Sequence, residues 1–134
     1  MKVFFDANFL VAAGLRPDGD YSKILLNGKD IFLTSEHILD EVARNLSRLG
    51  RDANAHVNWL RKIMTVTDRF DLLPAGTPLS GSGDRQALAE AIGAGCDLFV
   101  TSDTDFSALF GQTIKGVRIE KSAIYARKSV YGET

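Results

Sequence analysis

Short apolar runs alternate along this chain with longer stretches in which apolar residues recur at helical spacing. Such runs are typical of strands buried on both faces, and such stretches are typical of helices that cover a sheet. The predicted strands span residues 3–5, 31–34, 98–100 and 116–119, and residues 70–73 are predicted to form a further strand or an extended segment. The predicted helices span residues 9–13, 21–26, 36–49, 52–64 and 84–92, with a further short helix around 124–125.

The alternation of strands and helices predicts an α/β fold, with three α/β/α layers around a central, mostly parallel sheet of four to five strands. The length of 134 residues predicts one domain over 1–134, large enough to bury a core without covalent staples. Residues 75–83, rich in Gly, Pro and Ser, form the one predicted flexible loop, which is too short to separate two domains.

The composition is that of an ordinary soluble globular protein, with 45% hydrophobic and 25% charged residues. No apolar run approaches the ~20 residues of a membrane span, so no membrane association is expected. Cys96 is the only cysteine, which excludes an intramolecular disulfide and makes a cytoplasmic location the default expectation. No thiol-enzyme motif surrounds Cys96, so it is expected to be a packing residue.

Basic residues concentrate in the predicted helices between residues 36 and 64, although the net charge is only −1. Basic side chains with an aromatic neighbour, here Trp59, fit a nucleic-acid surface. More often such residues form a solvated helix face, with the aromatic residue, here Trp59, in the core or at a subunit interface. We favour the solvated face, because runs of charge are weak motifs.

Acidic side chains stand at the ends of two of the predicted strands. Asp6 follows Val3–Phe5, and Asp103 follows Leu98–Val100 after two hydroxyl residues, with Asp105 two positions later. The carboxyl ends of strands in an open α/β sheet meet at one edge, where such sheets bind ligands. A helix N-cap is the alternative interpretation of Asp6, at about even weight.

Two further acids are delivered by helices. The spacing of Glu41 puts it on the flank of an apolar helix face, and does not distinguish a residue at the sheet edge from a solvated one paired with Arg44 or Arg48. Asp84 lies in the first turn of its helix on the inward stripe, where an unpaired carboxylate is costly. The alternative is that Asp84 caps its helix, because helix N-termini tolerate acids well. We favour a cation at the sheet edge as the partner of Asp84.

An alternating topology brings these acids to the same edge of the sheet, because strand ends and the starts of the following helices meet there. Asp6, Glu41, Asp84 and Asp103 therefore converge, with Asp105 as a possible fifth member. Their mutual repulsion requires divalent cations or protonation for relief. Because the ligands are oxygen atoms, with no histidine or cysteine in a ligand pattern, Mg²⁺ or Mn²⁺ fits best.

The chain resembles the PIN-domain family over nearly its whole length. Each motif is weak alone, and the order and the attachment to strands and helices make the combination specific. The motifs that carry the resemblance are Asp6-Ala7-Asn8, Leu39-Asp40-Glu41-Val42, the run from Asp84 to Ala91, and Thr101-Ser102-Asp103-Thr104-Asp105-Phe106. Members of this family are mostly metal-dependent ribonucleases, and no acidic position of the family pattern is missing here.

The resemblance implies an endoribonuclease that uses Mg²⁺ or Mn²⁺ to hydrolyse RNA phosphodiesters. It implies catalytic roles for Asp6, Glu41, Asp84 and Asp103. The expected nearest metal ligands are Asp6, Asp84 and Asp103, with Glu41 and Asp105 binding through water or a second ion. Asn8, Thr101 and Ser102 are expected to orient the ligands or contact the phosphate, and Arg16, Arg44, Arg48 and Arg85 are candidates to bind the RNA backbone.

The resemblance also suggests partners. Many prokaryotic members are toxins neutralised by a small antitoxin, others process RNA, and homodimers are common, so an RNA substrate, a small antitoxin and a homodimer are all expectations. One alternative is a non-catalytic PIN scaffold that binds RNA or protein and uses the acids to hold a structural ion. Another is phosphoryl transfer to a strand-end Asp, disfavoured because the haloacid-dehalogenase-like pattern requires Asp where Asn8 stands.

Overall fold

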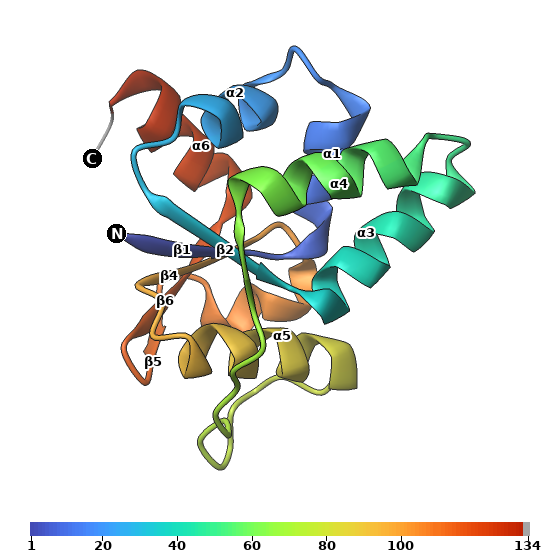
Figure 1. The fold of residues 1–134 in the computed structure, drawn as a ribbon. Coiled ribbons are helices and arrows are strands. Elements are labelled where there is room, and N and C mark those ends of the chain that lie inside the picture. Colours follow the sequence, from blue (N-terminus) through green and yellow to red (C-terminus); the bar gives the residue numbers. More distant parts are fainter. Residues whose placement is uncertain (133–134) are drawn as a thin grey trace.

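A sheet of six strands in the order β3-β2-β1-β4-β6-β5 organises the fold in a computed structural model that describes residues 1–132 (Figure 1). The strands are β1 Lys2–Phe5, β2 Ile31–Ser35, β3 Thr65–Thr67, β4 Leu98–Thr101, β5 Thr113–Ile114 and β6 Val117–Lys121. The helices are α1 Ala7–Leu15, α2 Asp20–Asn27, α3 Glu36–Arg48, α4 Ala53–Ile63, α5 Ser82–Gly93, the 3₁₀ helix η1 Thr104–Leu109 and α6 Ser122–Tyr131. None of the helices in these residues is long and apolar enough to cross a membrane.

Five of the six strands run parallel, and only β5 pairs antiparallel, with β6. The carboxyl ends of the parallel strands therefore lie at one edge of the sheet, called the carboxyl edge below. Phe5 ends β1 there, Thr101 ends β4, and Lys121 ends β6. Because α1, α3 and α6 follow their strands directly, their first turns lie at the same edge.

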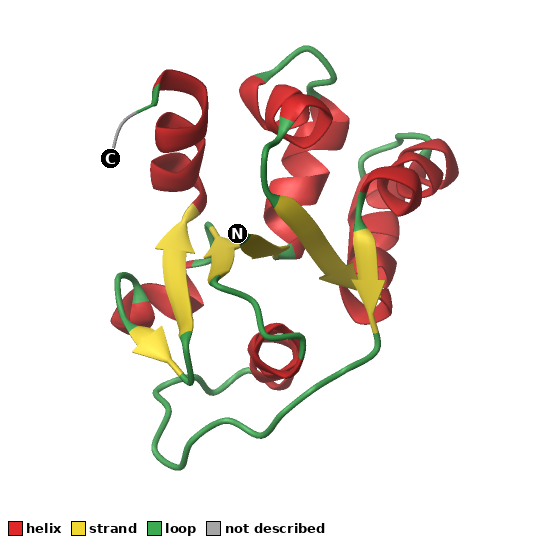
Figure 2. Ribbon diagram, turned by 60° about the vertical axis from the view of Figure 1, so that its left-hand side comes forward, coloured by secondary structure: helices red, strands yellow, loops and turns green. Residues whose placement is uncertain are grey.

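Helices cover both faces of the sheet, which confirms the predicted three-layer α/β/α class (Figure 2). On one face, Phe5 stacks on Phe9 of α1 at 4.3 Å between ring centroids, and meets Tyr125 of α6 edge-on at 5.6 Å. On the other face, Phe99 packs on Phe106 of η1 at 5.0 Å, and α5 lies beside η1. Apolar rings from both faces thus form the core on either side of β1 and β4.

The number and position of the strands differ from the sequence prediction of four to five. The two-residue strand β5 was not predicted. Of the two interpretations of residues 70–73, the strand is wrong, because the strand that pairs with β2 is Thr65–Thr67. Residues 70–73 instead cross the outside of α5, where the Asp71 N–H donates to the Ala89 carbonyl at 3.0 Å. Phe70 and Leu72 are 72% and 74% exposed.

Gly93 permits this crossing, because a Cβ atom at that position would overlap the backbone of Phe70. The segment therefore lies closer to α5 than any side chain would allow. Residues 70–73 have the composition of a strand, but their backbone is bonded to a helix and not to the sheet.

A buried Glu90 connects α5 to the strand on which α3 begins. Ser35 Oγ donates to Glu90 Oε1 at 2.7 Å and also accepts from the Ile38 N–H at 3.2 Å, as the N-cap of α3. Burial raises the pKa of the Glu90 carboxyl, and the Ser35 hydroxyl opposes that rise. These bonds fix α5 against the end of β2, close to the carboxyl edge.

Cys96 is buried just before β4, in agreement with the packing role predicted for it. Burial raises the pKa of its thiol to about 11, so the thiolate is scarce at neutral pH.

Two glycines of α5 offer a matched test of the crossing segment. Gly93→Ala is expected to destabilise the fold by about 1–3 kcal/mol, because the new methyl group must displace the backbone of Phe70. Gly83→Ala meets only an ordinary contact, at 3.7 Å from His37, and is expected to be neutral or to stabilise by up to about 1 kcal/mol. Urea unfolding of both variants measures the difference, and equal stabilities would contradict the close approach.

Candidate metal centre

Asp6 is the most deeply buried acid at the carboxyl edge, with only 7% of its surface exposed. Its Oδ1 accepts from the Ala7 N–H at 2.9 Å, and its Oδ2 accepts from the Thr101 hydroxyl at 2.7 Å. The predicted N-cap of α1 is therefore present, and the same carboxylate also faces the other acids. Burial raises its pKa against these two hydrogen bonds, and the charges of Glu41 and Asp103 raise it further.

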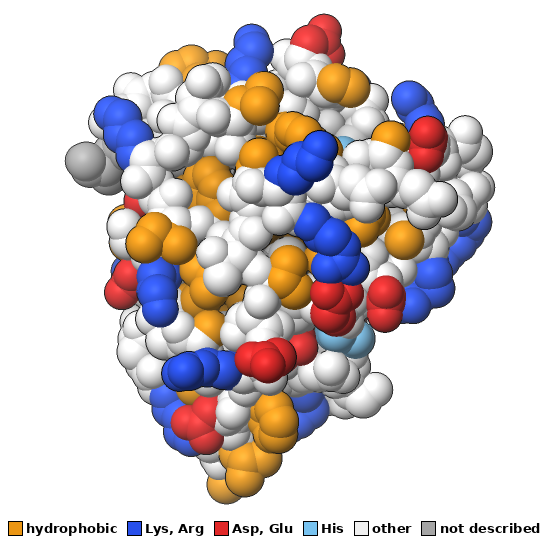
Figure 3. All heavy atoms as spheres, in the orientation of Figure 1, with side chains coloured by type: hydrophobic (Ala, Val, Ile, Leu, Met, Phe, Trp, Pro, Cys, Tyr) orange, Lys and Arg blue, Asp and Glu red, His pale blue; other side chains and the backbone are white. Residues whose placement is uncertain are grey.

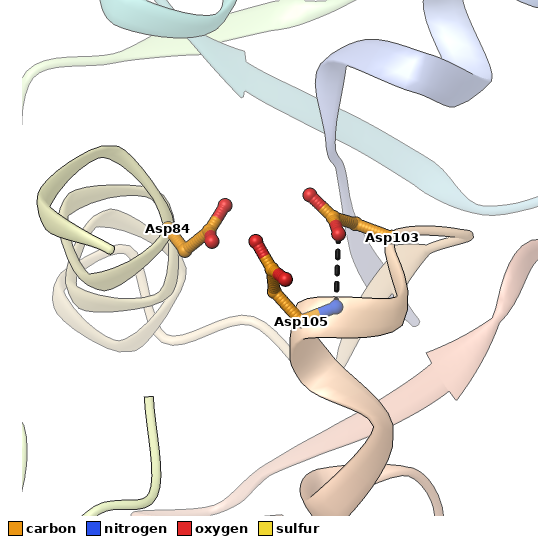
Figure 4. Close-up of side chains that lie close together, drawn as sticks. All are labelled: Asp84, Asp103 and Asp105. Carbon is orange, nitrogen blue, oxygen red and sulfur yellow. Dashed lines mark hydrogen bonds between the residues drawn. The ribbon is translucent and has the colours of Figure 1, made fainter. Parts of the chain in front are cut away.

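Asp84, Asp103 and Asp105 form a compact cluster beside Asp6. One carboxylate oxygen from each lies within 4.8 Å of those of the other two. Asp84 extends from the first turn of α5, whereas Asp103 and Asp105 extend from the start of η1, and the three side chains point toward one another (Figure 4). Asp103 also caps η1, because its Oδ1 accepts from the Asp105 N–H at 2.9 Å.

The electrostatics of this cluster show crowding of like charges. Partial burial raises the pKa of Asp84 to about 6, with the charge of Asp103 and a side-chain hydrogen bond with Asp105 as further causes. Protonation of Asp84 would relieve the repulsion in part, and a divalent cation would relieve it more completely. The cluster offers only carboxylate oxygens, so the residues fit a hard cation such as Mg²⁺ or Mn²⁺.

Glu41 lies half-buried on α3, and its charge acts on Asp6 across the site. Within residues 1–132, it makes no ion pair with Arg44 or Arg48. The structure therefore favours the interpretation of Glu41 as a residue at the sheet edge over a surface partner of those arginines. Glu41 is outside the three-acid cluster of Asp84, Asp103 and Asp105.

The three polar residues expected to support the acids lie at the same edge. The Thr101 hydroxyl, wholly buried, donates to Asp6 and accepts from the Asp103 N–H at 3.1 Å, so one side chain links two of the acids. Asn8 Oδ1 accepts from the Ser102 N–H at 3.4 Å, which ties the first turn of α1 to the end of β4. The Ser102 side chain itself is exposed.

The arginines considered as RNA contacts do not gather around the acids. Arg16 follows the last residue of α1 and Arg48 is the last residue of α3, roughly 14 Å or more along each axis from the carboxyl edge. Arg44 is exposed midway along α3. Arg85 is next to Asp84, but its Nη1 donates to the Leu79 carbonyl at 2.7 Å and is thereby bound to its own loop.

One cation at the carboxyl edge was not predicted as a site residue. Lys121 ends β6, directly beside Thr101 in the sheet register. The predicted strand ended at residue 119, which left Lys121 in a polar tail. Strand β6 continues for two residues beyond the predicted end, which places Lys121 at the carboxyl edge with the acids.

Fold and site together define a class: an α/β protein with a carboxylate centre at the carboxyl edge of a parallel sheet. The chain belongs to the PIN domain family, whose family model matches residues 3–110. This match spans all the predicted acidic positions, from Asp6 to Asp105.

Two solved structures share the fold at low sequence identity. The VapBC2 structure from Rickettsia felis, bound to a DNA fragment from its promoter, contains a chain that matches with a TM-score of 0.64 and 16% identity, over 90% of this chain and 98% of that chain. VapC20 of Mycobacterium tuberculosis, a toxin that cleaves the sarcin–ricin loop, matches with a TM-score of 0.58 and 21% identity, over 79% of this chain and 93% of that chain. A search for relatives among curated proteins found no match.

The raised pKa of Asp84 predicts that the metal-free protein loses stability with increasing pH. Its folded-state pKa of about 6 exceeds the ordinary 3.8, so the unfolding free energy falls as pH rises through that interval. Asp84→Asn removes this loss and is expected to raise the melting temperature in EDTA at pH 7, with little difference at pH 4. Asp97→Asn, at the opposite edge, where Asp97 accepts from the Lys2 N–H, is the control. An unchanged melting temperature for Asp84→Asn would contradict the repulsion.

Proposed function

We propose that this protein is a Mg²⁺- or Mn²⁺-dependent endoribonuclease that hydrolyses RNA phosphodiesters. The observation that carries the proposal is the cluster of Asp84, Asp103 and Asp105 beside the buried Asp6. Membership in the PIN domain family, a family of nucleases, supports hydrolysis as the reaction class. An acidic centre of this kind repels an RNA backbone unless cations are present, which agrees with metal dependence.

Asp84, Asp103 and Asp105 would hold the metal, together with the free electron pairs of the Asp6 carboxylate. A divalent cation bound there would supply Lewis acidity for the phosphate and lower the pKa of a coordinated water. Neighbouring groups keep the acidic side chains in position. The Thr101 hydroxyl keeps Asp6 in one orientation, and the cap on η1 keeps the Asp103 carboxylate aimed at Asp84.

Glu41 would act from the α3 side of the site. Its negative charge adds to that on Asp6, and the proposed role of Glu41 is to bind a second ion or a metal-bound water. Asn8 and Ser102 join α1 to β4 at the same edge, where they would orient the ligands or contact the phosphate. The chain thus supplies a rigid set of oxygen donors on strand and helix ends, which is the preorganisation that metal-assisted hydrolysis requires.

We further propose that the protein is the toxin of a toxin–antitoxin pair, with RNA as substrate, a small antitoxin as partner and a homodimer as assembly. The fold neighbours support this direction, since one is from a VapBC complex and the other is an RNA-cleaving VapC toxin. A cytoplasmic location stays a prediction from the sequence.

Replacement of a single acid is expected to abolish cleavage. Asp6→Asn and Asp103→Asn should each lower Mn²⁺-dependent cleavage of a labelled RNA on the order of 10²-fold or more, because each removes a charge that the metal requires. Asp97→Asn keeps its backbone hydrogen bond at the opposite edge and should retain wild-type activity. Circular dichroism and melting temperature establish that the variants fold. Full activity in either site variant would overturn the metal assignment.

Cleavage of mixed RNA with Mg²⁺, with Mn²⁺ and with EDTA, followed by sequencing of the new ends, tests activity, metal need and specificity together. The expected result is discrete new ends that appear only with a divalent cation. Stable binding of RNA in Mn²⁺ without any new ends would instead support a non-catalytic scaffold that holds a structural ion.

A further inference from the structure

The end of β6 places a lysine in line with the acidic centre. Thr101 of β4 is paired with Lys121 of β6, just as Phe99 is paired with Ile119. Registered neighbours in a parallel sheet point to the same face, so Thr101 and Lys121 share a face. Thr101 bonds to Asp6 on its other side. Asp6, Thr101 and Lys121 therefore form a row along the carboxyl edge, and two strand spacings of about 4.8 Å separate its ends.

The Lys121 side chain is held without being neutralised. Its Nζ lies over the ring of Phe110, 5.2 Å from the centroid, and Phe110 directly follows η1, which carries Asp105. A ring face orients an ammonium group without removing its charge. Within the described part of the chain, no carboxylate pairs with Lys121, and the residue is exposed.

Two arginines close to this edge, Arg61 and Arg85, are already engaged by other groups. Arg61 makes a two-pronged ion pair with Glu36, at the start of α3. Arg85 donates to the carbonyls of its own loop. Elsewhere the charges are mixed: the face in Figure 3 shows blue and red side chains interspersed, with no continuous basic field. A polyanion that reaches the acids therefore needs a specific cation beside them, and Lys121 meets that need.

We propose that Lys121 binds an RNA phosphate that flanks the scissile one, and so holds the strand across the acidic centre. This inference rests on the proposed ribonuclease function. It adds that the substrate backbone is held from the β6 side of the acidic centre. Lysine suits the task as a point charge that contacts a phosphate without reading the base. The first turn of α6 begins at the next residue, and its helix dipole adds positive potential at the same place.

The test compares Lys121→Gln with Lys62→Gln in cleavage of one labelled single-stranded RNA between 50 and 200 mM NaCl, about the range in which phosphate contacts dominate salt dependence. Lys121→Gln is expected to raise KM about tenfold at the low-salt end with kcat unchanged, since a flanking contact is made equally in the ground and transition states. The slope of log kcat/KM against log salt concentration should become shallower by about 0.7.

Lys62 is exposed near the end of α4, which leads into β3, and β3 lies on the far side of β1 and β4 from β6. Lys62→Gln therefore controls for the loss of one charge. It should change neither KM nor the slope. Lys121→Arg keeps the charge and should keep the wild-type slope, whereas Phe110→Leu removes the ring beneath the ammonium and should raise KM by less than Lys121→Gln. Melting temperatures check the folding of all four variants.

The outcomes separate this inference from the function on which it rests. If the wild type cleaves the RNA and Lys121→Gln matches it in KM and in salt slope, the lysine contact is overturned and the nuclease stands. A loss confined to kcat overturns it as well, because it would place Lys121 in the chemical step. If the wild type neither binds nor cleaves RNA with Mn²⁺, the proposed function and the contact fail together.

Discussion

The carboxylate of Asp6, buried at the end of the central strand, sets the geometry of the whole site. Burial of a charge is tolerated only where hydrogen bonds replace the lost water, and here the Ala7 N–H and the Thr101 hydroxyl do so. Those two bonds join β1, α1 and β4 at one point. A slip of β1 against β4 by one residue would move Asp6 to the other face and leave Thr101 unpaired, so the register and the site are fixed together.

Gathering the other acids around this point lowers stability in exchange for affinity for a cation. The cluster of Asp84, Asp103 and Asp105 concentrates negative charge that no arginine or lysine of residues 1–132 neutralises by a direct ion pair. The backbone opposes the repulsion locally, because Asp103 is fixed by the cap that it makes on η1. Natural proteins commonly sacrifice stability in this way at functional sites, where the residues are arranged for a ligand.

The sequence predicts the parts of this structure that depend on the spacing of apolar residues and on the residues at strand ends. The strands β1 and β4 at the core and the helices between residues 36 and 63 follow from the spacing of apolar residues. The convergence of the acids follows from the alternation of strands and helices. The segment 70–73 escapes prediction because its position depends on a distant glycine, Gly93, which allows the backbones to touch.

Side-chain partners are equally invisible to a sequence pattern, because they depend on register. Nothing in the spacing of Arg85 shows that its own loop binds it, and nothing in the sequence around Ser35 shows that Glu90 of α5 reaches it. Lys121 belongs to the same group, since only its pairing with Thr101 brings it beside the acids.

The two outermost strands, β3 and β5, are three and two residues long. Each therefore exposes very few unpaired backbone groups, whereas the longer strands lie inside the sheet. An edge of this kind is a poor template for strand addition by another chain. The short edge strands therefore protect the sheet against edge-to-edge pairing with other chains.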